Sequence, residues 1–493
     1  MPIWENIMKI TCKSVLLSLL LSLALCLSSC GVIYFNRGTE GENSDTDGVT
    51  DAVTEDLDKY EQNYSNDVTS FMKDLSGKTY GGATVQIAVA GKDLIIPDDT
   101  TPTVIADDMR EAVATVEEKL DISIITKKTD PDTMLDSLKA SVRSGDYYAD
   151  IVMLPQSYIG AYVAADAVIN LRSLPGFDTN PGYIYPSALS AGTGGDSVYA
   201  VAGPASLDAD SLSCVYFNKS IISSLGLESP YDLADRGEWT KDKYAEYANA
   251  VSTLSGEETY YSYGSQNTTP YLADLFFFAF GGILTESNIG YYPVLSLNGD
   301  ASAACVESVK GAVNLPSAYG SSLESIDAFL SGKMLFLVDR LSTMSSLANA
   351  SFDWGLLPLP KVDSEQENYI SLSYYEDAMF FAGAATATDY EACADVISAL
   401  NINSYGYKND AYILNASYYY LRDNRSMTML SYILSNPIYD FAYSFGEKNS
   451  YVANGTFMAV RNTVAGISSL QRYLDMYNRL FENSMYSMFK VIN

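Results

Sequence analysis

The absence of one residue type, histidine, limits the chemistry that this chain can carry out. Its 493 residues include no histidine, which excludes a Ser-His-Asp triad, a Cys-His pair and any histidine-ligated metal. Acid–base chemistry would have to rest on carboxylates, lysines or tyrosines. In a chain with 61 Asp and Glu residues, pairs of carboxylates arise by chance, so no pair marks a catalytic site. We therefore expect no catalytic residue, no metal and no cofactor.

A second chemical signal lies near the N-terminus, at Cys30. Lys9 and Lys13 precede a run of leucine and serine that ends in Leu27-Ser28-Ser29-Cys30. A charged start and a short apolar run are typical of a secretory signal peptide. The last four residues resemble a bacterial lipobox, which implies cleavage before Cys30 and a diacylglycerol on its thiol. We expect residues 1–29 to be a signal peptide. The lipid on Cys30 is then expected to anchor the chain to the extracellular face of the cell membrane. The alternative is an ordinary signal peptide or a short anchor helix.

Charge and composition restrict the partners. The chain has 30 basic and 61 acidic residues, and this formal net charge of −31 opposes nucleic acid and anionic lipid headgroups. Attachment to a membrane would then come from the lipid on Cys30. Residues 30–76 are acidic and poor in large apolar side chains, so we expect a solvated tether there. Three further cysteines, Cys214, Cys305 and Cys393, lie in apolar contexts and are expected to be buried free thiols.

The folded part is expected to begin at residue 77 with alternating strands and helices. Residues 83–90, 121–125 and 149–155 have strand patterns, whereas 103–120 and 130–145 have the apolar spacing of helices. This order predicts the opening of a doubly wound parallel sheet, an α/β fold. Ligands bind beyond the carboxyl ends of the strands in such sheets. The segments after the first and third strands, around Lys92 and at Gln156-Ser157-Tyr158, are therefore expected to face a cleft, with plain loops as the alternative.

The middle of the chain carries short motifs in a fixed order. They are Tyr216 with Asn218-Lys219, Gly226-Leu227, Pro230, Trp239-Thr240, Phe280-Gly281-Gly282, Phe329 with Gly332-Lys333, and Trp354-Gly355 with Pro358 and Pro360. In this order, after a lipobox, they resemble those of family 1 extracellular solute-binding proteins, the group that includes maltose-binding protein. The resemblance covers roughly residues 80–445. Phe217, between Tyr216 and Asn218, departs from the family pattern.

The resemblance implies a periplasmic-binding-protein-like fold with two α/β lobes and a ligand cleft between them. We expect the first lobe at residues 77–205 and 341–402, and the second at 206–340 and 403–493, which includes the C-terminal helices. The chain would cross between lobes near 202–213, 338–343 and 401–412. Members of the family deliver a solute to an ABC permease, so the expected partners are a carbohydrate, permease subunits and a membrane.

Ten residues are candidate ligand contacts, because aromatic rings stack on sugar faces and planar polar groups bond hydroxyls. They are Gln156, Tyr158, Asn218, Trp239, Phe280, Asp339, Arg340, Tyr374, Tyr375 and Glu376. For Trp239 the alternative is a hydrophobic contact before a helix, and for Asp339 and Arg340 it is a local salt bridge. Residues 374–376 stand where the family has a loop of small residues, so this loop departs from the family.

Two other functions stay open at this point. A lipid-anchored, carbohydrate-active enzyme would need two carboxylates about 5–10 Å apart, and the missing histidine does not exclude it. A sensor or scaffold lipoprotein would present the same cleft to a receptor instead of a permease. Permease genes beside this one would favour transport.

Overall fold

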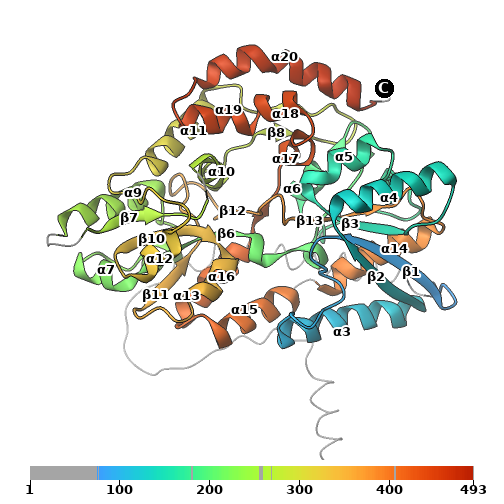
Figure 1. Cartoon of the computed structure of the whole chain (residues 1–493), viewed down its shortest axis with the longest axis horizontal. Helices are drawn as coiled ribbons and strands as arrows, with labels where there is room; N and C mark the ends of the chain where they lie inside the picture. Colours follow the sequence, from blue (N-terminus) through green and yellow to red (C-terminus); the bar gives the residue numbers. More distant parts are fainter. Residues whose placement is uncertain are drawn as a thin grey trace, which may run out of the picture. The chain divides into compact units, whose positions relative to one another are not determined.

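The computed structural model describes residues 75, 77–178, 181–254, 259–267, 269–404 and 407–491 (Figure 1). The predicted signal peptide (1–29), Cys30 and nearly all of the acidic segment 30–76 lie outside these residues. None of the described helices is both long and apolar enough to cross a membrane. Cys214 and Cys393 are buried and Cys305 is partly buried, and all three are free thiols, as expected.

The first lobe is built on a four-stranded sheet. Its order is β13 (Met379–Gly383), β3 (Ile151–Pro155), β1 (Ala83–Ala90) and β2 (Ile122–Thr129). Strand β1 is parallel to both β2 and β3, whereas β13 is antiparallel to β3. The predicted β-α-β-α-β opening is therefore confirmed.

Local sequence explains the helices of this lobe. In α3 (Thr103–Leu120), Met109, Val116 and Leu120 are buried along one face. In α4 (Pro131–Ser144), the Asp130 side chain accepts a hydrogen bond from the Thr133 N–H at 2.8 Å, and Gly145 ends the helix with a φ of 76°. A later helix, α14 (Tyr390–Ser404), packs against α3. The loop after β1 leads into α3, whereas β3 leads directly into η1 (Gln156–Tyr158).

The second lobe has its own four-stranded sheet. Its order is β11 (Trp354–Leu357), β6 (Ser213–Asn218), β10 (Met334–Arg340) and β7 (Tyr261–Gly264). Because β11 pairs with β6, the expected return to the first lobe at residue 341 is wrong. The chain stays in the second lobe through Leu357 and crosses through residues 358–378 to β13. The motif that begins at Trp354-Gly355 did not indicate which sheet this segment joins.

The other crossings involve short helical segments. One runs through η3 (Pro204–Ser206) and η4 (Ala209–Ser211) into β6. Another leaves α14 through α15 (Tyr407–Tyr419), which contacts both α3 and α16 (Asn424–Ser435), and α16 packs on β11. In Figure 1, α15 and α3 lie along the lower side of the two sheets.

The C-terminal helices contact both lobes. They are α17 (Phe441–Gly446), α18 (Ser450–Gly455), α19 (Phe457–Val464) and α20 (Leu470–Met488). Helix α17 packs on η1 (Gln156–Tyr158) and α5 (Ile159–Ala164) of the first lobe, and α19 packs on α10 (Thr269–Ala279) of the second. Figure 1 shows α17–α20 on the upper side, opposite α15 and α3.

Candidate functional site

Strand ends from both lobes meet at residues 374–378, the end of the crossing segment before β13. From the first lobe, the Gln156 N–H donates to the Ala378 carbonyl at 2.8 Å and the Ser157 N–H donates to the Tyr375 carbonyl at 3.2 Å. From the second lobe, Arg340 at the end of β10 donates to Asp377 Oδ2 at 2.8 Å. Its guanidinium also lies 4.6 Å from the centre of the Tyr374 ring. Gln156, Arg340, Tyr374 and Tyr375, all predicted from the sequence, are thus brought together.

Further aromatic rings, from α10, α17 and α19, pack against Tyr374 and Tyr375, and we call these rings together the aromatic wall. The Tyr271 ring meets the Tyr374 ring edge-on with centroids 4.8 Å apart. Tyr375 stacks on Tyr443 at 4.7 Å with an interplanar angle of 3°, and Tyr443 stacks on Phe457 at 5.2 Å. We call Gln156, Tyr271, Arg340, Tyr374 and Tyr375 the Tyr374 cluster.

Three polar atoms of the Tyr374 cluster are buried without a hydrogen-bond partner. They are Gln156 Oε1, Tyr271 OH and Arg340 Nε. Gln156 itself is held in place, because its Nε2 donates to the Asp440 carbonyl at 2.8 Å and to Ser444 Oγ at 3.2 Å. Leaving a buried polar group unpaired costs about 1–3 kcal/mol, so each of these atoms gains from a ligand that supplies a partner. Towards a polar ligand, Gln156 Oε1 can accept a hydrogen bond, Arg340 Nε can donate one, and the Tyr271 hydroxyl can do either.

A buried ion pair supports the aromatic wall. Arg461 of α19 donates from Nε to both carboxylate oxygens of Asp274 on α10, at 2.9 and 3.1 Å. The Asp274 side chain is 2 % exposed and that of Arg461 is 13 % exposed. The guanidinium also lies 4.6 Å from the centre of the Phe457 ring. This pair joins the helix that carries Tyr271 to the helix that begins with Phe457.

Sequence reasoning missed Tyr271, Tyr443, Phe457 and the Asp274–Arg461 pair. A usable signal was present: Asp274 is the single charged residue in the otherwise apolar stretch "YLADLFFFAF". Isolated charges on buried helices are paired or functional, because unpaired burial is costly. What the sequence could not give was the partner, which lies 187 residues away.

Three predicted residues do not face the Tyr374 cluster. Trp239 is 0 % exposed, and its indole N–H donates to the Pro358 carbonyl at 3.0 Å. Asn218 caps α7 (Lys219–Ser224) by accepting from the Ser220 and Ile221 N–H groups. Phe280 is buried against Phe276. The expectation that these three contact a ligand is therefore corrected: they stabilise the core of the second lobe.

The remaining predicted residues lie at the edge of the cluster. Glu376 is exposed and accepts from the Tyr374 hydroxyl at 3.1 Å, and the partly buried Tyr158 donates to Asp132 at 3.2 Å. Asp339 is buried and accepts from the Arg340 N–H at 2.8 Å, and burial raises the pKa of its carboxyl group. The Arg340 side chain forms its salt bridge with Asp377 and not with Asp339, which accepts only from the Arg340 backbone N–H.

Comparison of the sequence with known families gives one decisive match. Residues 111–405, more than half of the chain, match the model for bacterial extracellular solute-binding proteins. The chain belongs to this family. The family recognised from the motifs is thereby confirmed. A search of curated proteins found no match.

Solved structures show the same two-lobed fold. A cyclo/maltodextrin-binding protein complexed with maltotetraose has a TM-score of 0.52 and 14 % identity, and the match covers 84 % of this chain and 100 % of that one. The cyclic alpha-maltosyl-1,6-maltose binding protein from Arthrobacter globiformis has a TM-score of 0.52 and 14 % identity over 82 % and 100 %. The galacto-N-biose-/lacto-N-biose I-binding protein of the ABC transporter from Bifidobacterium longum, in complex with lacto-N-biose, has a TM-score of 0.51 and 12 % identity over 83 % and 98 %. The expected fold class, α/β with two lobes, is confirmed.

Proposed function

We propose that this solute-binding protein captures a carbohydrate, of oligosaccharide size, at the Tyr374 cluster between its lobes. The observation that carries the proposal is the set of buried, unpartnered polar atoms on Gln156, Tyr271 and Arg340, which lies among tyrosine rings. A sugar supplies hydroxyl groups for those atoms and flat C–H faces for the rings. The sugars bound by the structural neighbours named above support the same class of ligand.

Ligand entry would require the lobes to separate, because the tyrosine rings are packed against one another. Solute-binding proteins of two lobes close around a ligand by hinge motion, which is a shift between open and closed populations. The crossing segments, including residues 358–378, would carry that hinge. The closed form, held to the outer face of the membrane by a lipid on Cys30, would then present the sugar to an ABC permease.

Calorimetric titration of the mature protein with maltotetraose and lacto-N-biose tests the proposal. Arg340→Ala and Gln156→Leu should each weaken binding at least about tenfold, a loss of about 1.4 kcal/mol. Arg236→Ala is the matched control, because Arg236 pairs only with exposed glutamates on the same lobe and should leave affinity unchanged. Equal effects of Arg340→Ala and Arg236→Ala, or no binding of either sugar, would count against the site.

The same samples separate binding from turnover. A binding protein returns the sugar intact after prolonged incubation, whereas a carboxylate-based glycosidase would release shorter products. The anchor is tested separately: Cys30→Ala should move the protein from the detergent phase to the aqueous phase of cell extracts. A variant that still partitions with detergent would contradict the lipid anchor.

A further inference from the structure

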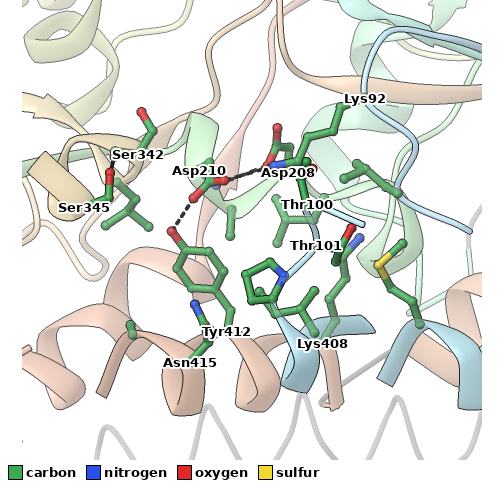
Figure 2. A pocket seen from close by; sticks show the side chains of 18 of the residues that line it. Lys92, Thr100, Thr101, Asp208, Asp210, Ser342, Ser345, Lys408, Tyr412 and Asn415 are labelled. Atoms are coloured by element: carbon green, nitrogen blue, oxygen red, sulfur yellow. Dashed lines mark hydrogen bonds and ion pairs between the residues drawn. The ribbon is translucent and has the colours of Figure 1, made fainter. Parts of the chain in front are cut away.

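The two lobes stand apart on the side of α15, where a hollow of about 430 Å³ lies between them (Figure 2). We call it the α15 pocket. Its walls are the loop after β1 with the start of α3, residues 207–210 of the first crossing segment, residues 341–345 after β10, and α15 with Lys408 and Tyr412. It is part of the cleft between the lobes.

Charged side chains of the α15 pocket are paired with one another. Lys92 Nζ lies 2.8 Å from Asp208 Oδ1 and 3.0 Å from Asp210 Oδ2. The Tyr412 hydroxyl donates to Asp210 Oδ1 at 2.7 Å (Figure 2). On this side of the molecule, the crossing segments and long side chains join the lobes.

Two short hairpins lie on the opposite side, beside the C-terminal helices. Strands β4 (Thr193–Gly194) and β5 (Ser197–Val198) form the first hairpin, and Val201, shortly after it, pairs with β13 of the first lobe. Strands β8 (Thr285–Glu286) and β9 (Val294–Leu295) form the second hairpin, between α10 and α11 of the second lobe. Strand β8 contacts α17 and β9 contacts α20. Each lobe therefore contributes one hairpin to this side.

The two hairpins are in direct contact. The Gly290 N–H, at the tip of the second hairpin, donates to the Gly195 carbonyl at 3.0 Å. The buried Ser287 donates from Oγ to the Thr193 carbonyl at 2.7 Å. Between these bonds, Ile289 packs against the apolar core of the first lobe. A segment of the second lobe thus contributes a side chain to the core of the first.

The residues directly after α20 join the same hairpin of the first lobe. Phe489 is 3 % exposed, and its ring lies 5.2 Å from that of Phe445 on α17. The Lys490 carbonyl accepts from the Asp196 N–H at 3.0 Å. A Cβ at Gly194 would lie 2.2 Å from the Phe489 ring, so only glycine permits this close approach. The hairpin is therefore shaped to receive Phe489.

Helix α20 connects this contact to the second lobe. It follows α19, which the Arg461–Asp274 ion pair holds against α10. Figure 1 shows α20 running along the upper side, from α19 and α11 towards α5. For the lobes to separate on this side, the hairpin hydrogen bonds must break and Ile289 and Phe489 must leave apolar surroundings. Burial of apolar side chains and pairing of buried polar groups both favour the joined state.

We propose that the β4–β5 hairpin, the β8–β9 hairpin and Phe489-Lys490 form an interlobe latch, which holds the lobes together opposite the α15 pocket and opens as a unit when they separate. This inference rests on the lobe motion of the proposed function, but not on the identity of the solute. Because a ligand can enter only the open form, the latch would set the fraction of molecules that are able to bind.

Three variants separate the latch from general loss of stability. Phe489→Ala removes the anchor of α20 on the first lobe. Ser287→Ala is milder, because it removes one hydrogen bond between the hairpins and keeps every core side chain. Phe329→Ala is the control, because Phe329 is equally buried but packs against Phe352 within the second lobe.

The test is hydrogen exchange, measured by mass spectrometry on the unliganded mature protein, together with small-angle scattering. Phe489→Ala should accelerate exchange at least about tenfold in both residues 193–198 and residues 285–295, and should increase the radius of gyration. Ser287→Ala should accelerate the same two segments by a smaller factor, and Phe329→Ala should leave both unchanged.

Two results would overturn the latch. One is faster exchange of only one of the two segments in Phe489→Ala or, if that variant does not fold, in Ser287→Ala. The other is a radius of gyration that stays at the wild-type value in a variant whose segments both exchange faster. Neither measurement uses a sugar, so failure of maltotetraose and lacto-N-biose to bind would count against the proposed function and leave the latch standing.

Discussion

The Tyr374 cluster and the α15 pocket differ in what each already possesses. The cluster holds three buried polar atoms without partners, but its rings are in contact, with Tyr375 and Tyr443 only 4.7 Å apart. The pocket holds about 430 Å³ of space, but its charged groups are largely paired with one another. A ligand at the cluster must separate packed rings, and in return it forms hydrogen bonds with polar atoms that had no partner. A ligand at the pocket needs to displace few side chains, but each contact contributes less because the charged groups there are already paired. The cluster is therefore suited to a ligand-driven change of conformation and the pocket to weaker binding.

The ion pairs of the two regions differ in the same way. Asp274 and Arg461 beneath the aromatic wall are 2 % and 13 % exposed. At the pocket, Lys92 and Asp210 are 51 % and 44 % exposed, and only Asp208 is buried, at 9 %. A buried charge left without its partner is costly, while an exposed pair contributes little.

The largest effect is expected from Asp274→Ala. Removing the carboxylate leaves the Arg461 guanidinium buried and unpaired, which should lower the free energy of unfolding by about 3–5 kcal/mol. Urea denaturation measures the loss. Asp232→Ala is the control, because its partner Arg425 is 40 % exposed and keeps Asp235, so a loss below about 1 kcal/mol is expected. Similar losses in the two variants would show that the pair beneath the cluster is solvated.

A smaller effect is expected from Trp239→Phe. The change keeps an aromatic ring in the core but removes the indole N–H that bonds the Pro358 carbonyl, at the start of the crossing segment leading to Tyr374. The unpaired carbonyl should lower the free energy of unfolding by about 1–3 kcal/mol. Because the indole is buried in the second lobe, the affinity of the folded protein for maltotetraose or lacto-N-biose should stay unchanged in calorimetry. A loss of affinity without a loss of stability would return Trp239 to the binding site.

Trp239 also shows where prediction from sequence ends. Strands and helices of the first lobe followed from apolar spacing, which is a local property. Gln156 and Arg340 were found because they lie at the ends of predicted strands, and topology fixes the edge of the sheet at which strands end. Tyr374 was found because of its aromatic ring and its place in a segment where the family has a loop. Residue type alone, however, does not say whether a tryptophan faces a cleft or a core, and both environments favour large rings. The Arg461–Asp274 pair and the α15 pocket form between residues that are far apart in the chain, such as Lys92 and Tyr412 of the pocket. The spacing of apolar residues along the sequence does not predict such contacts.

The smallest effect concerns Lys408, which tests the charge balance of the α15 pocket. Burial lowers the pKa of its ammonium group to about 8, although Asp208 and Asp108 oppose the shift and Lys92 adds to it. In the unfolded chain the pKa is near 10.5, so between pH 8 and 10.5 the unfolded state binds more protons than the folded one. Stability contributed by this group therefore rises with pH across that window. It is lost as pH falls from 10.5 towards 8, and it changes little below 8, where both states hold the proton. Going from pH 8 to 9 should stabilise the wild type by roughly 1 kcal/mol relative to Lys408→Met, whose side chain cannot titrate. Urea denaturation of both proteins at the two pH values gives this difference directly, with other titrating groups common to both. Parallel changes in the two proteins would mean that Lys408 stays charged in the folded protein over this pH range.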